Sequence, residues 1–356
     1  MPIRQVHSIP AHADRIWSVA PHPTLPLLAC ATSEKSAQIY SLNTYFPVAN
    51  LDGNHKRSIR SVAWRPESTD EPTSEIVLAT ASFDGTVGIW VRDDERYAQE
   101  EWEFVASLEG HENEVKCVNW SSDGRYIASC SRDKSVWVWE ALDGIEEIEC
   151  MAVLQDHTQD VKHVVWHSLE ELIASASYDD TIRLWREDDG EFVCSSELTG
   201  HRSTVWCVDF ETPRRADSND DEDETMNRRL VSCSADETVR VWRRTGITGA
   251  LTGRYMPSTL RNDPVSETWQ QEAILPSRHS GPIYSVSWSA RSGRIVSAGA
   301  DGLLVVYQET KPGEWEVIAE EEDAHSVFEI NTCVWKEEII ITGGDDGNIN
   351  IWQVTA

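Results

Sequence analysis

Seven histidines along this chain each open a segment of nearly constant length. Each segment closes on an aromatic residue, in most cases 28 residues after the histidine. The segments run from His12 to Tyr40, His55 to Trp90, His111 to Trp139, His157 to Trp185, His201 to Trp242, His279 to Tyr307 and His325 to Trp352. A fixed period of this kind indicates stacked structural units, each of which buries its apolar face only against its neighbours.

Two further positions recur at fixed distances before the closing aromatic. An acidic residue lies six positions before it, at Glu34, Asp84, Asp133, Asp179, Asp236, Asp301 and Asp346. Ten positions before it the chain has Cys30, Thr80, Ser129, Ser175, Ser232, Ser297 and Thr342. A buried imidazole, carboxylate, hydroxyl and indole can satisfy one another's hydrogen bonds. We therefore interpret these columns as structural rather than catalytic.

The repeat has the period and the strand pattern of the WD40 unit. Aliphatic residues alternate before each closing aromatic, as at Ile182 and Leu184 before Trp185, and a tight polar turn precedes them. Such units close radially into propellers. The sequence therefore predicts an all-β fold in which residues 1–356 form a single seven-bladed WD40 β-propeller. Too few residues follow Trp352 for another strand, so we expect the segment Gln5–Ile9 to complete the last blade.

Charge and hydropathy exclude several functional classes. The chain has 31 basic and 61 acidic residues and a net charge of −30, which disfavours direct nucleic-acid binding. No apolar run approaches 18 residues and the N-terminus has no signal-peptide core, so we expect a soluble intracellular protein without membrane contact. Three acidic or extended insertions, at residues 67–75, 211–228 and 243–267, are predicted to lie on one face of the propeller.

Cysteine and histidine usage does not indicate a metal centre. None of the eight cysteines forms a Cys-x-x-Cys pair, and most occupy small-residue columns of the predicted strands, so they are interpreted as reduced core thiols. His163 and His167 have the spacing of a metal pair but lack a third ligand nearby. We predict no metal, no cofactor and no enzymatic activity, because no nucleophile, base and orienting group stand outside the structural columns.

The face opposite the insertions carries the functional prediction. Cationic and aromatic residues gather in two columns around the expected mouth of the central channel. The first column contains Trp17, Arg60, Lys116, Lys162, Trp206 and Tyr284, and the second contains Phe83, Arg132 and Tyr178. Arginine and lysine hold carboxylates, while aromatic side chains supply contact area and cation-π interactions. We infer a site for a peptide tail that is both anionic and aromatic. The alternative is that these entry positions face solvent and vary freely.

Trp137 stands in a column that is otherwise mostly polar or small. We attribute it to packing between the third and fourth blades rather than to a partner contact.

Several segments resemble one family closely. They are residues 131–140 (SRDKSVWVWE), 157–167 (HTQDVKHVVWH), 175–185, 299–302 and 342–347. They are similar to the WD-repeat subunit of the targeting complex of cytosolic iron–sulfur protein assembly, CIA. The resemblance covers essentially the whole chain.

That resemblance implies a non-enzymatic adaptor, cytosolic and also nuclear. Its implied partners are a small acidic CIA adaptor subunit, a HEAT-repeat CIA scaffold subunit, a hydrogenase-like iron–sulfur carrier and apo iron–sulfur client proteins. Many clients of the family end in an acidic or polar residue and a final aromatic.

Two residue-level consequences follow from the resemblance. The arginine of the family's Ser-Arg-Asp-Lys-Ser turn is functionally important, and Arg132 matches it. Animal members carry Leu-Tyr-Arg, a cochaperone motif, where this chain has Leu184, Trp185 and Arg186. Because Trp185 is expected to be buried, the resemblance does not carry that role here.

A second functional hypothesis needs no family. A generic WD40 scaffold, such as a chromatin-tail reader or a ubiquitin-ligase substrate receptor, would use its acidic face to hold basic peptides. It predicts salt-dependent binding of basic tails that is lost when residues 220–224 are removed.

Overall fold

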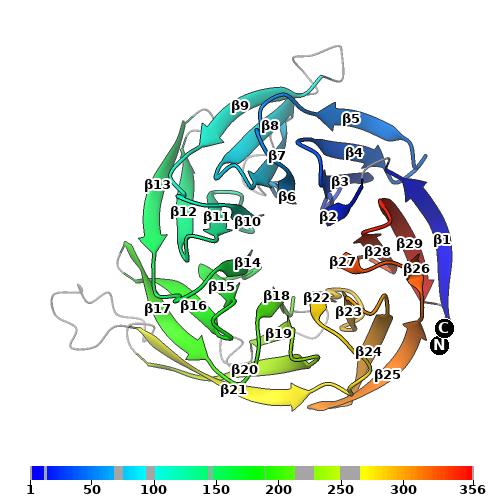
Figure 1. Ribbon diagram of the computed structural model, residues 1–356. Coiled ribbons are helices and arrows are strands. Elements are labelled where there is room, and N and C mark those ends of the chain that lie inside the picture. Colours follow the sequence, from blue (N-terminus) through cyan, green and yellow to red (C-terminus); the bar gives the residue numbers. More distant parts are fainter. Residues whose placement is uncertain are drawn as a thin grey trace.

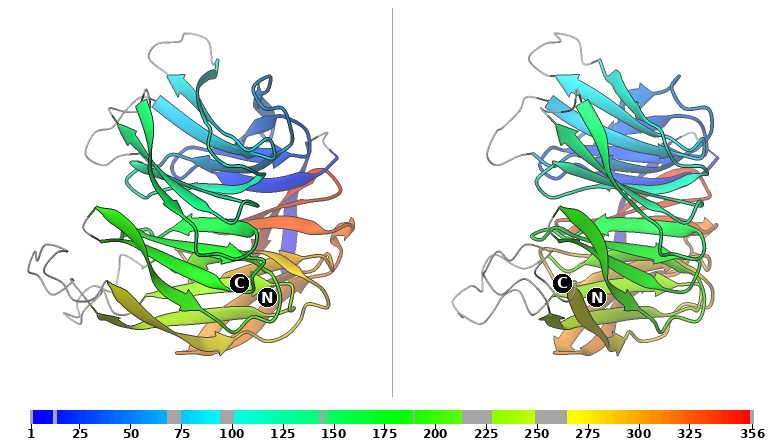
Figure 2. Two further views of the ribbon diagram at one scale, coloured as in Figure 1. Left: turned by 60° about the vertical axis from the view of Figure 1, so that its left-hand side comes forward. Right: turned by 90° about the vertical axis from the view of Figure 1, so that its left-hand side faces the viewer.

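Seven four-stranded antiparallel sheets surround a common axis in the computed structural model (Figure 1). The structure describes residues 2–11, 14–67, 75–93, 101–142, 145, 147–188, 190–212, 228–248 and 265–354. Seen from the side, the molecule is a thick disc across which the strands run (Figure 2). The predicted seven-bladed, all-β propeller is confirmed.

Each blade is one sheet whose strands follow one another from the axis outward. Blades one to four are β2 (Ile16–Pro21), β3 (Leu27–Thr32), β4 (Ala37–Ser41) and β5 (Pro47–Leu51); β6 (Ile59–Trp64), β7 (Glu75–Ser82), β8 (Val87–Asp93) and β9 (Glu103–Leu108); β10 (Val115–Trp120), β11 (Tyr126–Ser131), β12 (Val136–Leu142) and β13 (Glu147–Leu154); and β14 (Val161–Trp166), β15 (Leu172–Ser177), β16 (Ile182–Asp188) and β17 (Glu191–Leu198).

The remaining blades follow the same order, and a short strand, β26 (Ala324–Val327), leads into the last one. Blades five to seven are β18 (Val205–Phe210), β19 (Arg229–Ser234), β20 (Val239–Thr248) and β21 (Ser266–Ile274); β22 (Ile283–Trp288), β23 (Ile295–Gly299), β24 (Leu304–Lys311) and β25 (Glu314–Glu321); and β27 (Ile330–Lys336), β28 (Ile339–Gly344), β29 (Asn348–Val354) and β1 (Ile3–Pro10).

The hydrophobic core lies between adjacent blades. The second strand of a blade is buried on both faces, as β11 is along its whole length, whereas the outermost strand β13 is largely exposed. One cluster joins Val138 of blade three to Val164 and Trp166 of blade four. The alternation of aliphatic residues seen in the sequence is therefore the pattern of sheets that pack face to face around a ring.

The N-terminal strand closes the ring. β1 pairs antiparallel with β29, from Ile3 opposite Val354 to Pro10 opposite Asn348, as the sequence predicted. The two ends of the chain consequently lie beside each other (Figure 1). This pairing covers the edge that β29 would otherwise expose.

The structural columns form the predicted hydrogen-bonded sets. In blade four, His157 lies 2.8 Å from Asp179 and 2.7 Å from Ser175, and Trp185 Nε1 donates to Ser175 Oγ at 2.8 Å. Equivalent sets begin at His55, His111, His201, His279 and His325.

Blade one differs from this pattern. His12 lies outside the described residues, Cys30 is fully buried, and the Tyr40 hydroxyl donates to Gln38 at 2.5 Å instead.

The prediction that Trp137 packs between blades three and four is wrong. Trp137 stacks on Trp139 and lies tilted against His111, with both pairs of ring centroids 5.2 Å apart, and its Nε1 donates to Ser135 at 2.9 Å. It therefore covers the hydrogen-bonded set of its own blade rather than the interface with blade four. A Cβ at Gly110 would lie only 2.3 Å from the indole, so this contact requires glycine there.

The three expected insertions fall mainly outside the described residues. The described part of 67–75 is its two end residues, and that of 211–228 is residues 211, 212 and 228. Within 243–267, β20 continues to Thr248 and β21 begins at Ser266, so a hairpin occupies both ends of that span. The acidic run at residues 220–224 lies outside the described residues.

Candidate functional site

A β-bulge at the start of every inner strand creates the first column of the site. In β10 the pairing register jumps from Val115 to Cys117, and Lys116 is left without a cross-strand partner. The same shift recurs in the other six inner strands. A bulge re-aims the side chain of its extra residue. The unpaired positions are Trp17, Arg60, Lys116, Lys162, Trp206, Tyr284 and Asn331, which we call the bulge column.

The second column lies in the turns at the same end of the sheets. Phe83 follows β7, Arg132 follows β11 and Tyr178 follows β15. These turns adjoin the bulge column, because Lys116 contacts Phe83 and Lys162 contacts Tyr178. The two columns together are the mouth residues.

On blades two and three, cations surround Phe83. Lys116 Nζ lies 4.4 Å from the centroid of the Phe83 ring, and the guanidinium of Arg57 lies 5.7 Å from it. Glu114 joins these cations, because it pairs with Lys116 at 2.6 Å and with Arg57 at 2.9 Å. Burial alone would raise the pKa of Glu114, but the hydrogen bonds from Lys116 and Arg57 lower it below its usual value.

On blades four to six, one cation lies between aromatic rings. Lys162 Nζ is 5.2 Å from both the Tyr178 and the Trp206 ring centroids, and it donates to Asp160 at 3.2 Å. Trp206 in turn packs edge-on against Tyr284, with centroids 5.2 Å apart. Burial raises the pKa of Tyr284 to about 12, so this phenol stays protonated at neutral pH.

A cation also packs on an aromatic ring where blade one meets blade two. The Arg60 guanidinium lies 5.2 Å from the Trp17 centroid and donates to the Trp17 carbonyl at 2.9 Å. The ring centroids of Trp17 and Phe83 are 6.5 Å apart. Asn331 of blade seven binds the Ile16 carbonyl at 3.0 Å, so its side chain is engaged within the fold.

The mouth residues differ greatly in accessibility. The side chains of Lys116 and Lys162 are only 15% and 12% exposed and hold close acidic partners. The Arg132 side chain is 56% exposed and its closest acid, Glu114, is 3.8 Å away. Tyr178 is 54% exposed. Arg132 and Tyr178 are therefore the cation and the aromatic ring that this face offers most directly to a ligand.

Sequence reasoning missed several residues of this face. Glu114 and Asp160 precede the two mouth lysines by two positions, a spacing visible in the chain, and they neutralise part of the positive charge. Val327 and Phe328 are 87% and 45% exposed and lie beyond the turn at Ser326, whose φ is 58°. That turn belongs to the seventh blade, which has one more residue between its histidine and its inner strand than the other blades have.

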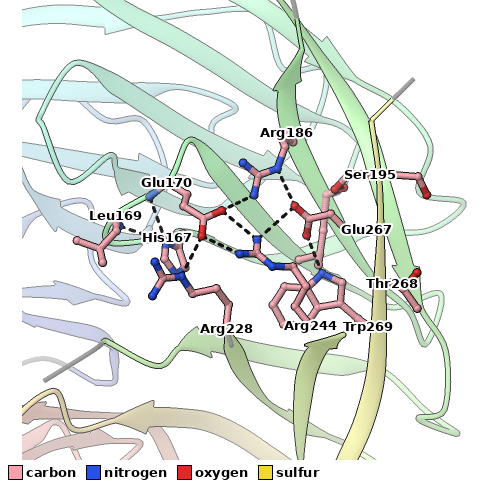
Figure 3. Close-up of polar contacts among 12 residues, drawn as sticks. His167, Leu169, Glu170, Arg186, Ser195, Arg228, Arg244, Glu267, Thr268 and Trp269 are labelled. Atoms are coloured by element: carbon pink, nitrogen blue, oxygen red, sulfur yellow. Dashed lines mark hydrogen bonds and ion pairs between the residues drawn. The ribbon is translucent and has the colours of Figure 1, made fainter. Parts of the chain in front are cut away.

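A buried ion network occupies the interface of blades four and five (Figure 3). Glu170 accepts hydrogen bonds from Arg186, Arg228 and Arg244, and Arg186 also donates to Glu267 at 2.6 Å. Arg244 and Glu267 are fully buried. Trp185 is 2% exposed and the Arg186 side chain 9%, so this Leu-Trp-Arg motif faces the interior.

The two histidines with metal-pair spacing occupy separate environments. His167 packs edge-on against Phe210 and accepts from the Leu169 and Glu170 amides, whereas His163 lies among cysteines near the axis. Within the described ranges, no group of three or more His, Cys, Asp or Glu side chains is arranged to hold a metal ion. Nor does that part of the chain contain a helix of the length and apolarity that crossing a membrane demands.

Together, the fold and the mouth residues define a WD-repeat propeller whose one face concentrates cations and aromatic rings. The WD domain, G-beta repeat family matches residues 3–41, 46–91, 102–140, 148–186, 192–243 and 270–308. A probable cytosolic iron-sulfur protein assembly protein 1 from Candida albicans is 47% identical over 99% of this chain and all of its own length. Proteins of the same name from Lodderomyces elongisporus and Emericella nidulans are 44% and 42% identical, over 99% and 97% of this chain and 100% and 95% of their own lengths. The chain belongs to this family of WD-repeat cytosolic iron-sulfur protein assembly proteins.

Proposed function

We propose that this protein is a non-enzymatic adaptor of cytosolic iron–sulfur protein assembly that recognises apoprotein clients at its mouth residues. Family membership supports the assembly role and a cytoplasmic location, through the names of the relatives. The observation that carries the recognition step is the exposed Arg132 guanidinium beside a ring of half-buried cations and aromatics, on a protein of net charge −30.

The geometry suits a client tail that ends in an acidic residue and an aromatic one. Arg132 presents a planar guanidinium that can hold a carboxylate through two parallel hydrogen bonds. Its loose 3.8 Å contact with Glu114 is readily exchanged for a closer one. The exposed Tyr178 ring offers a stacking surface for the aromatic end, and Lys162 beneath it adds positive charge.

The remaining mouth residues would preorganise this site. Lys116, Phe83, Arg60 and Trp17 pack on one another, so the cations keep their positions without a ligand. Preorganised groups lose little entropy when they bind. We also propose the other partners that the family resemblance implies, namely the acidic adaptor subunit, the HEAT-repeat scaffold subunit and the hydrogenase-like carrier.

A pull-down from cytosol tests the proposal. Wild-type protein and the Arg132→Glu and Lys162→Glu variants would be immobilised, and the captured proteins identified. Arg132→Glu is expected to fold because its side chain is 56% exposed, whereas the folding of Lys162→Glu is checked by circular dichroism because Lys162 is only 12% exposed. Both folded variants are expected to lose apo iron–sulfur proteins selectively. Unchanged capture of those clients by the folded variants contradicts the proposal. Retention of basic-tailed proteins alone would favour the generic scaffold instead.

A further inference from the structure

Two blades carry a pair of cysteines directly opposite each other in adjacent strands. Cys117 of β10 pairs in register with Cys130 of β11, and Cys207 of β18 pairs with Cys233 of β19. At the corresponding positions, blades one, two and six combine a serine with an alanine: Ser18 with Ala31, Ser61 with Ala81 and Ser285 with Ala298. The fold itself therefore does not require a thiol at any of these four positions.

The register places each pair within reach of a disulfide. Directly opposed residues in antiparallel strands have Cα atoms about 4.5–5.5 Å apart, inside the range that a disulfide spans. All four cysteines are free thiols, and Cys117 and Cys207 retain 6% and 7% exposure, whereas Cys130 and Cys233 are fully buried.

His163 connects the two pairs at the propeller axis. It occupies the position in β14 that Cys117 and Cys207 occupy in the neighbouring inner strands, and its imidazole interacts electrostatically with both thiols. Its ring is half-buried, and its Nδ1 has no hydrogen-bond partner within the described residues.

The surroundings favour ionisation of the two inner thiols. The opposed thiols of Cys130 and Cys233 lower the pKa of Cys117 and of Cys207, and the imidazole of His163 lowers both further, although burial alone would raise them. The thiolate is the reactive form of cysteine.

We propose that the Cys207–Cys233 and Cys117–Cys130 pairs, with His163 between them, form a redox modification site that peroxides convert to cross-strand disulfides. The Cys207 sulfur attacks one peroxide oxygen, the O–O bond breaks, and the released hydroxide becomes water by taking a proton. The resulting sulfenic acid is attacked by the Cys233 sulfur, the S–S bond forms, and the hydroxyl leaves as a second water with the Cys233 proton. Two thiols thus supply the two electrons that reduce one peroxide.

The proposal is tested by mapping cysteines in the full chain after treatment with hydrogen peroxide. Folded protein would be oxidised, denatured, alkylated and digested without reductant. We expect peptides joined through Cys207 and Cys233, and through Cys117 and Cys130, each lighter by two hydrogens. These joined peptides should form at least about tenfold faster than Cys30 or Cys333 is oxidised, which is measured as the loss of its alkylated peptide. Cys30 and Cys333 are expected to react slowly because each is buried and faces no cysteine in the neighbouring strand.

Variants taken from the other blades provide controls. Cys233→Ala copies the residue that four blades already carry, and it should leave Cys207 as a sulfenic acid that a dimedone probe captures. His163→Ser should slow disulfide formation and shift its pH dependence to higher pH. Oxidation of the four cysteines no faster than that of Cys30 and Cys333, or an absence of joined peptides, overturns the proposal. A rate and pH profile unchanged by His163→Ser overturns the role of the imidazole.

Discussion

At the scale of single residues, the histidines that define the repeat hold the blades together. In blade three, Asp133 lies 2.8 Å from His111 and also accepts hydrogen bonds from Ser135. Burial opposes ionisation, yet these hydrogen bonds lower the pKa of Asp133 to about 2. The carboxylate is therefore stabilised in the folded state, and the repeat's most visible residues serve stability rather than binding.

This shift predicts an acid-dependent contribution to stability. A folded pKa below the unfolded value of about 3.9 means that the contribution is complete above pH 5 and is lost as the pH falls toward 2. At pH 7 we expect Asp133→Asn to lower the free energy of unfolding by about 2 kcal/mol, and at pH 3 by about half as much. Urea denaturation of both proteins at several pH values measures this. Parallel pH profiles for the two proteins would refute it.

At the scale of elements, a buried ion network joins blade four to blade five. Glu170 lies between β14 and β15 and binds arginines from β16, β20 and the residue before β19. Burial alone would raise the pKa of Glu170, but these three arginines lower it far below its usual value. The carboxylate compensates charges that would otherwise be buried without partners.

Removing this charge should destabilise the propeller. Glu170→Gln leaves Arg186 and Arg244 to share Glu267 and removes the carboxylate that pairs with Arg228, and we expect the free energy of unfolding to fall by about 3 kcal/mol. Glu171→Gln is the matched control, since its side chain is exposed, and should change stability by less than about 0.5 kcal/mol. Chemical denaturation compares the two variants. Equal stabilities would mean that the network contributes nothing to the interface.

At the scale of the whole molecule, stability depends on closing the ring. β1 is the first strand in sequence and the outermost strand of the last blade, so it links the two ends of the chain. It buries Ile3 and Ile9 in two separate core clusters. The blades are similar units, but only this one is assembled from both termini.

Deleting residues 2–10 should therefore destabilise the entire protein. The loss of two buried isoleucines and of the pairing with β29 is expected to lower the free energy of unfolding by about 4 kcal/mol or more. The exposed edge of β29 should also promote aggregation. Thermal unfolding with light scattering measures both effects. Val6→Ala, at a position 48% exposed in the same strand, should behave like the wild type; an equally stable deletion variant would show that closure is dispensable.

How far the sequence predicted the structure depends on the kind of interaction. The blade count, the closing strand and the hydrogen-bonded sets could be predicted, because each rests on residues at fixed spacing. The bulge that aims Lys116 and Trp206 could not, since no residue type marks it. The ion network could not either, because Glu170 and Arg244 are distant in sequence and meet only when two blades pack. Trp137 was placed at the wrong interface for a related reason, as its contact depends on the absence of a side chain at Gly110.

The exposed Arg132 is proposed to recognise the anionic, aromatic end of a client. The direct test is the affinity of a synthetic peptide ending in an acidic residue and tryptophan for three proteins. These are the wild type, Arg132→Glu and Arg125→Glu; Arg125 lies in the same blade with a side chain 57% exposed, against 56% for Arg132. We predict that Arg132→Glu weakens binding at least about tenfold while Arg125→Glu stays within about twofold of the wild type. Equal affinity of the wild type and Arg132→Glu, or an equal loss in both variants, would contradict the claim.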